Sequence, residues 1–290
     1  MWSGAYLPGN CAADHSAPSR EPAISGIREN TEVEMFRTDP DPGRVYTTRR
    51  IVRSTDVTPS GRLRLDALAR YLQIAAEDDL ADSGLAEPVV WLVRRCELVI
   101  AALPVMGTRL TVGTFCSGTG PRWAERTTTL AGPDGPLVQA TAVWAAVNRA
   151  DGRPVALSPE FLAIYGPSAA GRIVSARLSH PRPPRLAAVA VPGEGTAGSS
   201  RDQVWALRAA DFDTAGHVNN AIHWAVVEDV LADTGCVPSV AEVEYHRAIL
   251  PGCTPRLVAE RREGEVAVWL LDSPASAPGW RLLASARLAG

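Results

Sequence analysis

The chain contains no lysine, so all 29 of its Lys or Arg side chains are arginine. Together with the abundance of alanine, glycine and proline, this bias is typical of a GC-rich genome and says nothing about mechanism. The formal net charge is −3 and the pI about 6.0, a balance that argues against nucleic acid or an anionic membrane surface as the main partner. With 290 residues, of which 46% are hydrophobic, the chain is long enough for one large domain or two compact ones.

Cysteines are few, and their spacing suggests no function. The five are odd in number, widely spaced and without a CxxC pair, so neither a disulfide framework nor a zinc site is expected. No apolar run approaches membrane-spanning length, and the first residues lack a basic segment followed by a hydrophobic stretch. We therefore predict a cytoplasmic protein with reduced thiols. The cysteines are Cys11, Cys96, Cys116, Cys236 and Cys253.

Residues 1–43 are rich in proline, glycine, serine and acidic side chains without periodicity, which predicts a disordered leader. We also hypothesise that Met35 is the true start of the protein, because order is expected to begin near residue 44. A domain is predicted over residues 44–166, in which apolar residues recur at helical spacing from Leu65 to Leu80 and a glycine closes the helix. Turn residues separate the remaining segments into strands of an antiparallel sheet, expected near residues 46–53, 90–101, 109–117, 124–130 and 138–148.

Residues 201–290 repeat this plan. A strand is expected at 201–210, then a turn, a helix from His217 to Thr234, and strands near 240–249, 255–262, 265–271 and 280–288. This pattern predicts an internal duplication. Between the copies, residues 167–200 have the composition of a flexible linker that packs little.

One turn carries the polar residues on which function would depend. Asp211 and Asp213 are expected at a strand end and, being one residue apart, to face opposite ways. Gly216 then supplies a positive φ. We expect residues 217–219 to form the first helical turn, whose backbone N–H groups lack intrahelical partners and attract negative charge. A carboxylate beside such a site is a hydrolytic arrangement, although Asp or Asn near a helix start is most often a cap.

Residues 211–221, Asp-Phe-Asp-Thr-Ala-Gly-His-Val-Asn-Asn-Ala, resemble the motif of hotdog-fold thioesterases, which place an Asp and a short turn before a long central helix. The preceding Trp205 and Arg208, and the length of the chain, resemble the acyl-ACP thioesterases, which are double-hotdog enzymes. In the first half, residues 94–98 and Trp144 are similar to the same family. The resemblance implies an α+β fold of two tandem hotdog domains, each a long central helix wrapped by an antiparallel sheet. The pair would mimic a dimer within one chain, and a homodimer of the whole chain is possible.

The resemblance also implies roles for the turn residues. Asp213 rather than Asp211 would act as nucleophile or as general base on a water molecule. The His217 ring would orient Asp213 or the water, or serve as a cap, with about equal chance. The oxyanion would be held by backbone N–H groups, and two asparagines would support the turn. The predicted oxyanion donors are Gly216, His217 and Val218, and the supporting asparagines are Asn219 and Asn220.

Three positions depart from the plant acyl-ACP enzymes. The middle Asn of their Asp-x-Asn-x-His motif is Ala215 here, and the Glu and Cys of their Tyr-Arg-Arg-Glu-Cys string are Ala248 and Ile249. His246, from the same string, would replace part of the lost function. In the first half, residues 54–61 stand where the motif would be, but their turn is expected to be longer, so we predict a single active site in the second half and an acyl pocket walled by the first.

The resemblance implies hydrolysis of fatty acyl-ACP to free fatty acid and ACP, in fatty acid biosynthesis, without a cofactor or metal. One alternative is an acyl-CoA thioesterase on the same fold. Another is a non-catalytic protein that binds acyl thioesters, which the departures make plausible. Basic residues of the expected linker could dock the acidic carrier protein, although a solvated linker is the simpler interpretation. These residues are Arg172, Arg177, His180, Arg182 and Arg185.

Overall fold

The computed structural model describes residues 36–86, 89–184, 201–232, 237–262, 264–272 and 279–290. The first-half elements are β1 (Tyr46–Ile51), η1 (Ser54–Asp56), α1 (Leu65–Asp82), β2 (Val89–Ile100), β3 (Arg109–Thr119), β4 (Trp123–Gly132), β5 (Gly135–Asn148) and α2 (Pro159–Ala169). The second-half elements are β6 (Arg201–Val204), η2 (Ala209–Asp211), α3 (Asn220–Ala232), β7 (Val240–Tyr245), β8 (Arg256–Arg262), β9 (Glu265–Asp272) and β10 (Arg281–Ala289). The predicted leader up to residue 35 lies outside the described residues.

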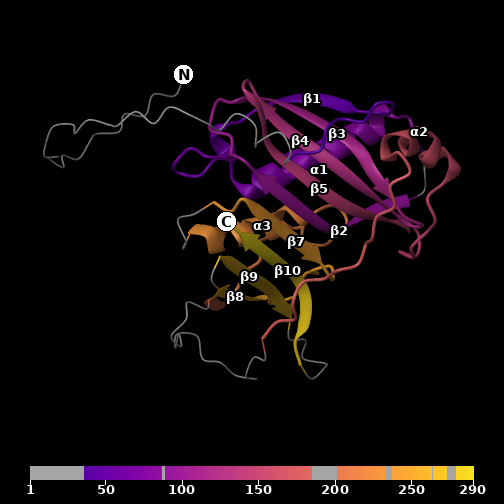
Figure 1. Cartoon of the computed structure of the whole chain (residues 1–290). Helices are drawn as coiled ribbons and strands as arrows, with labels where there is room; N and C mark the ends of the chain where they lie inside the picture. The colour runs from indigo at the N-terminus through magenta and orange to yellow at the C-terminus, as the bar shows by residue number, and fades with distance from the viewer. Residues whose placement is uncertain (1–35, 87–88, 185–200, 233–236, 263, 273–278) are drawn as a thin grey trace, which may run out of the picture. The chain divides into compact units, whose positions relative to one another are not determined.

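One antiparallel sheet contains all ten strands, in the order β1-β3-β4-β5-β2-β7-β10-β9-β8-β6 (Figure 1). Counted outward from the centre of the sheet, the first-half strands β2, β5, β4, β3 and β1 follow the same order as the second-half strands β7, β10, β9, β8 and β6. Each strand of one half therefore has an equivalent in the other, with β1 at one edge and β6 at the opposite edge. At the centre β2 pairs with β7 over Arg95–Val99 and Val240–Glu244, with Glu97 opposite Glu242. The predicted duplication and the α+β double-hotdog fold are therefore confirmed.

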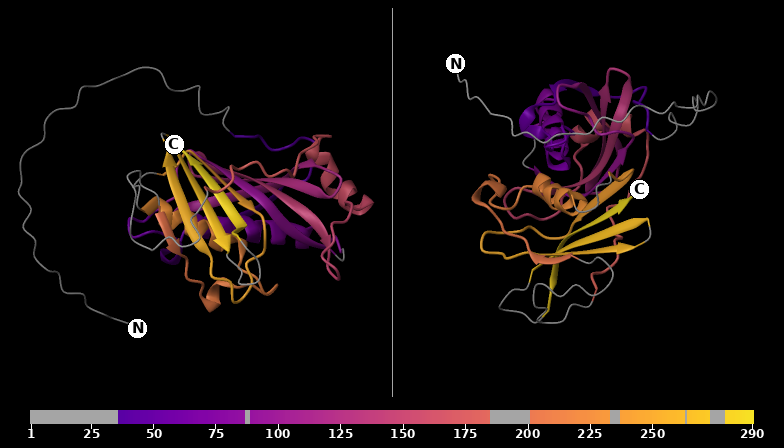
Figure 2. Two further views of the ribbon diagram at one scale, coloured as in Figure 1. Left: turned by 90° about the horizontal axis from the view of Figure 1, so that it is seen from below. Right: turned by 90° about the vertical axis from the view of Figure 1, so that its left-hand side faces the viewer.

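The long helices α1 and α3 contact one another and bury their apolar faces in a single core shared with the sheet (Figure 2). In α1 the predicted spacing is confirmed, with Leu65, Leu68 and Leu72 among the buried residues. The predicted start of α3 is wrong, because the helix begins at Asn220 and not at His217. The second-half strand is also shorter than predicted, since β6 ends at Val204 and Asp211 is the last residue of the 3-10 turn η2.

The sequence analysis missed α2. Its N-cap is Ser158, whose hydroxyl accepts the Phe161 N–H at 2.9 Å, and Pro159 occupies the first helical position. This Ser-Pro pair is a helix-start signal that the sequence carries. Phe161 and Tyr165 pack on Cys116 and Ala124 in a second apolar cluster, so α2 covers the sheet beyond the end of α1.

Two segments expected to pack little instead contact the sheet. Before β1, the Arg37 backbone exchanges hydrogen bonds with the Gln139 side chain at 2.8 Å. After α2, residues 170–184 continue along the sheet, where the Ser179 N–H donates to Glu244 at 2.5 Å and the Trp269 indole donates to the Pro181 carbonyl at 2.9 Å. The prediction of a loose linker is therefore wrong for residues 167–184, the first three of which end α2, and residues 185–200 lie outside the described residues.

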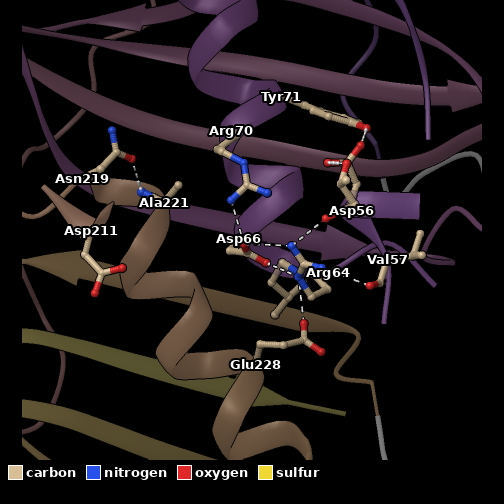
Figure 3. A network of polar contacts seen from close by, with 12 residues as sticks. Asp56, Val57, Arg64, Asp66, Arg70, Tyr71, Asp211, Asn219, Ala221 and Glu228 are labelled. Carbon is tan, nitrogen blue, oxygen red and sulfur yellow. Dashed lines mark hydrogen bonds and ion pairs between the residues drawn. The ribbon is translucent and has the colours of Figure 1, made fainter. Parts of the chain in front are cut away.

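The halves are also joined by an ion pair where α1 approaches α3. The Glu228 carboxylate of α3 accepts hydrogen bonds from both terminal nitrogens of Arg62, at 2.5 and 3.2 Å, and from the Leu65 N–H at 3.0 Å. Close by, Asp66 accepts from Arg64 and Arg70 (Figure 3). Glu228 therefore caps the first helix of the other half, and the pair crosses the boundary between the copies.

Replacing Glu228 with Gln should lower the free energy of unfolding by about 2 kcal/mol, because Arg62 would lose its partner in a largely buried site and the α1 cap would weaken. Urea denaturation measures this change. The matched control is Glu265→Gln, since the Arg287–Glu265 pair is more exposed and should contribute less than about 0.5 kcal/mol. Equal effects of the two substitutions would contradict this interpretation.

Candidate active site

The two aspartates of the turn have different environments. Asp211 is buried, with 1% of its surface exposed, and its carboxylate accepts the Arg208 N–H at 2.8 Å and the Arg208 guanidinium at 2.8 and 3.0 Å. Asp213 is only part-buried, with 22% of its side chain exposed, and one oxygen lies 3.4 Å from Nδ1 of His217. Asp211 therefore has a structural role, whereas Asp213 is accessible to a ligand.

The backbone of the turn is held by its own hydrogen bonds. The Gly216 N–H donates to the Asp213 carbonyl at 3.0 Å, and Gly216 takes the positive φ of 77° that its position requires. The Val218 N–H donates to the Ile249 carbonyl at 2.9 Å. The prediction that Gly216 and Val218 donate to an oxyanion is therefore wrong. Of the three predicted donors, only the His217 N–H lacks a partner within the described chain.

Asn219 ends the turn and caps α3. Its N–H donates to the Asp211 carbonyl and its side-chain oxygen accepts the Ala221 N–H, both at 2.9 Å. The next backbone N–H, that of Asn220, has no acceptor among the described residues and marks the N-terminus of the helix. The structural role predicted for Asn219 thus has a geometric basis, whereas Asn220 presents an open donor.

The first half contains the same turn, and not the longer one expected. Three backbone bonds recur: Gly61 N–H to Thr58 at 2.8 Å, Thr58 N–H to Arg62 at 2.8 Å, and Leu63 N–H to Pro104 at 2.7 Å. Gly61 has a φ of 87°, close to that of Gly216. Only the side chains differ, with Thr58 in the place of Asp213 and Arg62 in that of His217.

A cavity of about 720 Å³ opens at the second-half turn. It lies where β2 and β7 separate, because β7 pairs with β2 only as far as Glu244 and residues 245–249 then turn away toward Val218. Residues 89–94 of β2 and the second half of α1 complete its walls. Its apolar lining includes Leu80, Val89, Val93, Trp91, Trp144, Phe161 and Tyr165, and its polar lining includes Gln73, Glu77, Asp213, His217 and Asn220.

Two further residues of the cavity were missed by the sequence analysis. His223 and Tyr245 line it, and their rings meet edge to face with centroids 5.0 Å apart. The Tyr245 hydroxyl donates to the Asn220 carbonyl at 3.3 Å. Burial lowers the pKa of His223 to about 4, and the neighbouring carbonyls of Asn219 and Asn220 only partly oppose this fall. His223 is therefore neutral at pH 7.

His246 borders the cavity, but its ring is already engaged. Nε2 lies 3.1 Å from the Ser285 hydroxyl and 3.5 Å from the Glu244 carboxylate, and on the other side of Ser285 the buried His180 ring lies 3.0 Å away. This geometry gives His246 a role in holding the end of β7, and its ring contacts within the described chain are with Ser285 and Glu244 and not with Asp213.

Two members of the basic strip expected to dock a carrier protein are engaged within the chain. Arg172 pairs with the buried Glu125, and His180 lies 3.0 Å from Glu242. Arg177 and Arg182 are exposed, and Arg185 lies outside the described residues. Unpaired guanidinium groups are instead found in the cavity lining, where the side chains of Arg94, Arg149 and Arg247 have no hydrogen-bond or ion-pair partner in the described part of the chain.

The three departures from the plant pattern lie at the site. Ala215 and Ala248 line the cavity, and Ile249 contributes the carbonyl that fixes Val218. Within the described ranges, no group of three or more metal-binding side chains converges, and no helix is long and apolar enough to span a membrane. Cys96, Cys116 and Cys253 are free thiols, and burial raises the pKa of Cys96 to about 12.

The fold and the cavity define a double-hotdog protein whose site combines a carboxylate, a helix N-terminus and an apolar pocket. Residues 43–165 match the model of the acyl-ACP thioesterase N-terminal domain. This part of the chain is therefore similar to the N-terminal domain of acyl-ACP thioesterases, in agreement with the resemblance predicted from the sequence. The enzyme class that this match indicates is a thioester hydrolase acting on acyl-ACP.

Other comparisons cover both halves of the chain. The uncharacterized protein Rv2001 of Mycobacterium tuberculosis is 28% identical over 230 residues, which cover 78% of this chain and 87% of that protein. The structure of the 12:0-ACP thioesterase from Umbellularia californica superposes with a TM-score of 0.65 at 19% identity, covering 84% of this chain and 96% of that one. An acyl-ACP thioesterase from Bacteroides thetaiotaomicron gives 0.63 at 18% identity, with coverage of 84% and 97%. At these identities the two structures support the fold.

The buried His223 makes a prediction about stability and pH. Its pKa is lower in the folded chain than the unperturbed 6.5, so below pH 6.5 the unfolded chain binds a proton that the folded chain does not, and stability falls as the pH decreases. Between pH 7 and pH 4 this contribution should reach about 3 kcal/mol. The unfolding free energy of His223→Leu relative to wild type should therefore rise by this amount over the interval, and a pH-independent difference would contradict the assignment.

Proposed function

We propose that the protein hydrolyses fatty acyl thioesters of acyl carrier protein, releasing free fatty acid, with Asp213 as general base. The observation that carries this proposal is the placement of an accessible carboxylate beside an open helix N-terminus at the mouth of an apolar cavity. As part of the same proposal, the reaction belongs to fatty acid biosynthesis in the cytoplasm. It uses no cofactor, and the chain supplies both halves of the double hotdog itself.

Asp213 is oriented for proton transfer. The Ala215 N–H donates to its Oδ1 at 2.9 Å, which fixes the carboxylate, and Oδ2 faces His217. In the proposed reaction, Asp213 takes a proton from a water molecule, and the water oxygen adds to the thioester carbonyl carbon. When the tetrahedral intermediate collapses, the C–S bond breaks and the sulfur leaves with the proton as the carrier thiol. The products are a fatty acid and the free carrier.

The first half supports an assignment of the oxyanion donors. There, the Glu228 carboxylate occupies the N-terminus of α1 and accepts the Leu65 N–H and the Arg62 guanidinium. The equivalent groups in the second half are the Asn220 N–H and His217. Gln73 is the first-half equivalent of Glu228, because each is the ninth residue of its helix. The Gln73 side chain does not accept the Asn220 N–H, and its amide instead donates to Glu77 at 3.1 Å. The Asn220 N–H is therefore open to a developing oxyanion, together with the His217 N–H.

The walls of the cavity suit a fatty acyl chain. Beyond the turn they consist of apolar side chains from α1, β2 and α2, among them Leu80, Trp91 and Phe161, and such a lining stabilises a buried alkyl chain by about 0.8 kcal/mol per methylene. This arrangement supports the expectation that the first half walls the acyl pocket. The loss of the plant Asn, Glu and Cys leaves Asp213, His217 and the helix N-terminus to carry the chemistry.

Substituting Asn for Asp213 should lower kcat by about 100-fold or more, because the amide cannot accept a proton from water. Thiol release from acyl-ACP, followed with a thiol reagent, measures this loss. Thr58→Ala is the matched control, since Thr58 occupies the equivalent place in the first half, and its kcat should stay within about twofold of wild type. Full activity of Asp213→Asn would refute the assignment. Tight binding of acyl-ACP without turnover by wild type would favour the non-catalytic alternative.

The preferred carrier is identified by measuring kcat/KM for the same acyl group attached either to ACP or to CoA. We expect a higher kcat/KM with ACP, because the unpaired guanidinium groups of Arg94, Arg149 and Arg247 at the cavity complement an acidic carrier. Changing Arg247 to Ser should reduce kcat/KM for acyl-ACP and weaken its dependence on salt concentration. A higher kcat/KM with CoA would assign the protein to the acyl-CoA thioesterases.

A further inference from the structure

The cavity is lined by a buried histidine, His223, whose Nδ1 atom has no hydrogen-bond partner in the described part of the chain. Only 6% of the His223 surface is exposed. The Asn219 and Asn220 carbonyls lie near its ring, but Nδ1 makes no hydrogen bond of acceptable geometry with any described residue. Nevertheless, the residue lines the cavity beside Tyr245. Buried polar atoms in native proteins almost always have a partner, so the partner of His223 is expected to come from a ligand.

The first half shows that the architecture does not require a polar residue here. His223 is the fourth residue of α3, and the fourth residue of α1 is Leu68, which is fully buried in the core. A leucine would fill the same space without leaving a nitrogen unpaired. The histidine therefore destabilises the second half relative to its counterpart unless a bound molecule completes its hydrogen bond.

The position of His223 indicates which part of a substrate it meets. Exposure decreases along the site, from the exposed Thr214 to the part-buried Asp213 and the buried His223. The carrier arm must enter from the exposed side, so His223 faces the acyl chain. It follows Asn220 by three positions, and side chains of a helix point back toward its N-terminus. The ring is therefore within one helical turn of the proposed oxyanion donor, close to the first carbons of the acyl chain.

We propose that His223 hydrogen-bonds an oxygen on C3 of the acyl chain, so that the preferred substrates are 3-hydroxyacyl or 3-oxoacyl thioesters. This inference rests on the proposed thioester hydrolysis and specifies its substrate class. An uncharged imidazole suits an uncharged hydroxyl or keto oxygen, because it can donate or accept according to its tautomer. A saturated chain would leave the nitrogen unpaired, and a site built to bond a polar group discriminates against an analogue that lacks it.

The test compares 3-hydroxyacyl-ACP with saturated acyl-ACP of the same chain length, using the full chain and its His223→Leu and His223→Gln variants. The measured quantity is the ratio of the two kcat/KM values within each preparation, so that a partly unfolded variant lowers both values equally. Wild type should favour the 3-hydroxyacyl substrate. The ratio should fall by about tenfold or more in His223→Leu and be partly restored in His223→Gln, which keeps a hydrogen-bonding group.

A wild-type ratio of one or less, or an unchanged ratio in His223→Leu, would overturn the inference while leaving thioester hydrolysis intact. If wild type hydrolyses neither substrate, the proposed function fails and the inference is tested by binding. In that case calorimetry compares the amide-linked, non-hydrolysable analogues of the same two acyl-pantetheines. Tighter binding of the 3-hydroxyacyl analogue that His223→Leu abolishes supports the inference, and equal Kd values overturn it.

Discussion

The rest of the structure depends on the short ladder between β2 and β7. It extends over only five residue pairs, centred on Glu97 and Glu242, yet it joins two repeats, each of five strands and a long helix, into one sheet over a common core. Because the ladder stops at Arg95 and Glu244, the strand ends diverge, and this divergence makes the cavity. If the ladder were longer, residues 245–249 would pair with β2 and fill the cavity. The short pairing that joins the halves is therefore also the reason that the cavity exists.

The two turns show how one backbone can serve two purposes. Their main-chain hydrogen bonds are equivalent, and both use a glycine with positive φ, so the side chains are free to differ. In the first half Arg62 holds the Glu228 carboxylate against the start of α1, which closes that helix end with an internal anion. In the second half His217 and Asn220 line the cavity, and in the proposed reaction the same place receives the anion that develops on the substrate.

Much of the fold was predictable from the sequence, because it is carried by local patterns. The apolar spacing from Leu65 to Leu80 and the repeated strand segments are properties of neighbouring residues. The start of α3 was not predictable, since the Val218 N–H bonds to a carbonyl at Ile249, far along the chain. The packing of residues 170–184 depends on partners such as Glu244 in another strand. His223 was missed for a similar reason, because within a helix of apolar spacing nothing local distinguishes a buried ligand contact from a core residue.

The polar groups of the candidate site contrast with a buried ion-pair network in the first half. In the first half the buried Asp79 accepts from both Arg44 and Arg126, so its charge is fully compensated and serves packing. In the second half Asp213 keeps one oxygen toward the cavity, the Asn220 N–H is open, and His223 has an unpaired nitrogen. Incomplete satisfaction costs stability, and these three groups line one cavity. Since a substrate can complete these bonds at once, the same deficit that weakens the free protein favours the bound state.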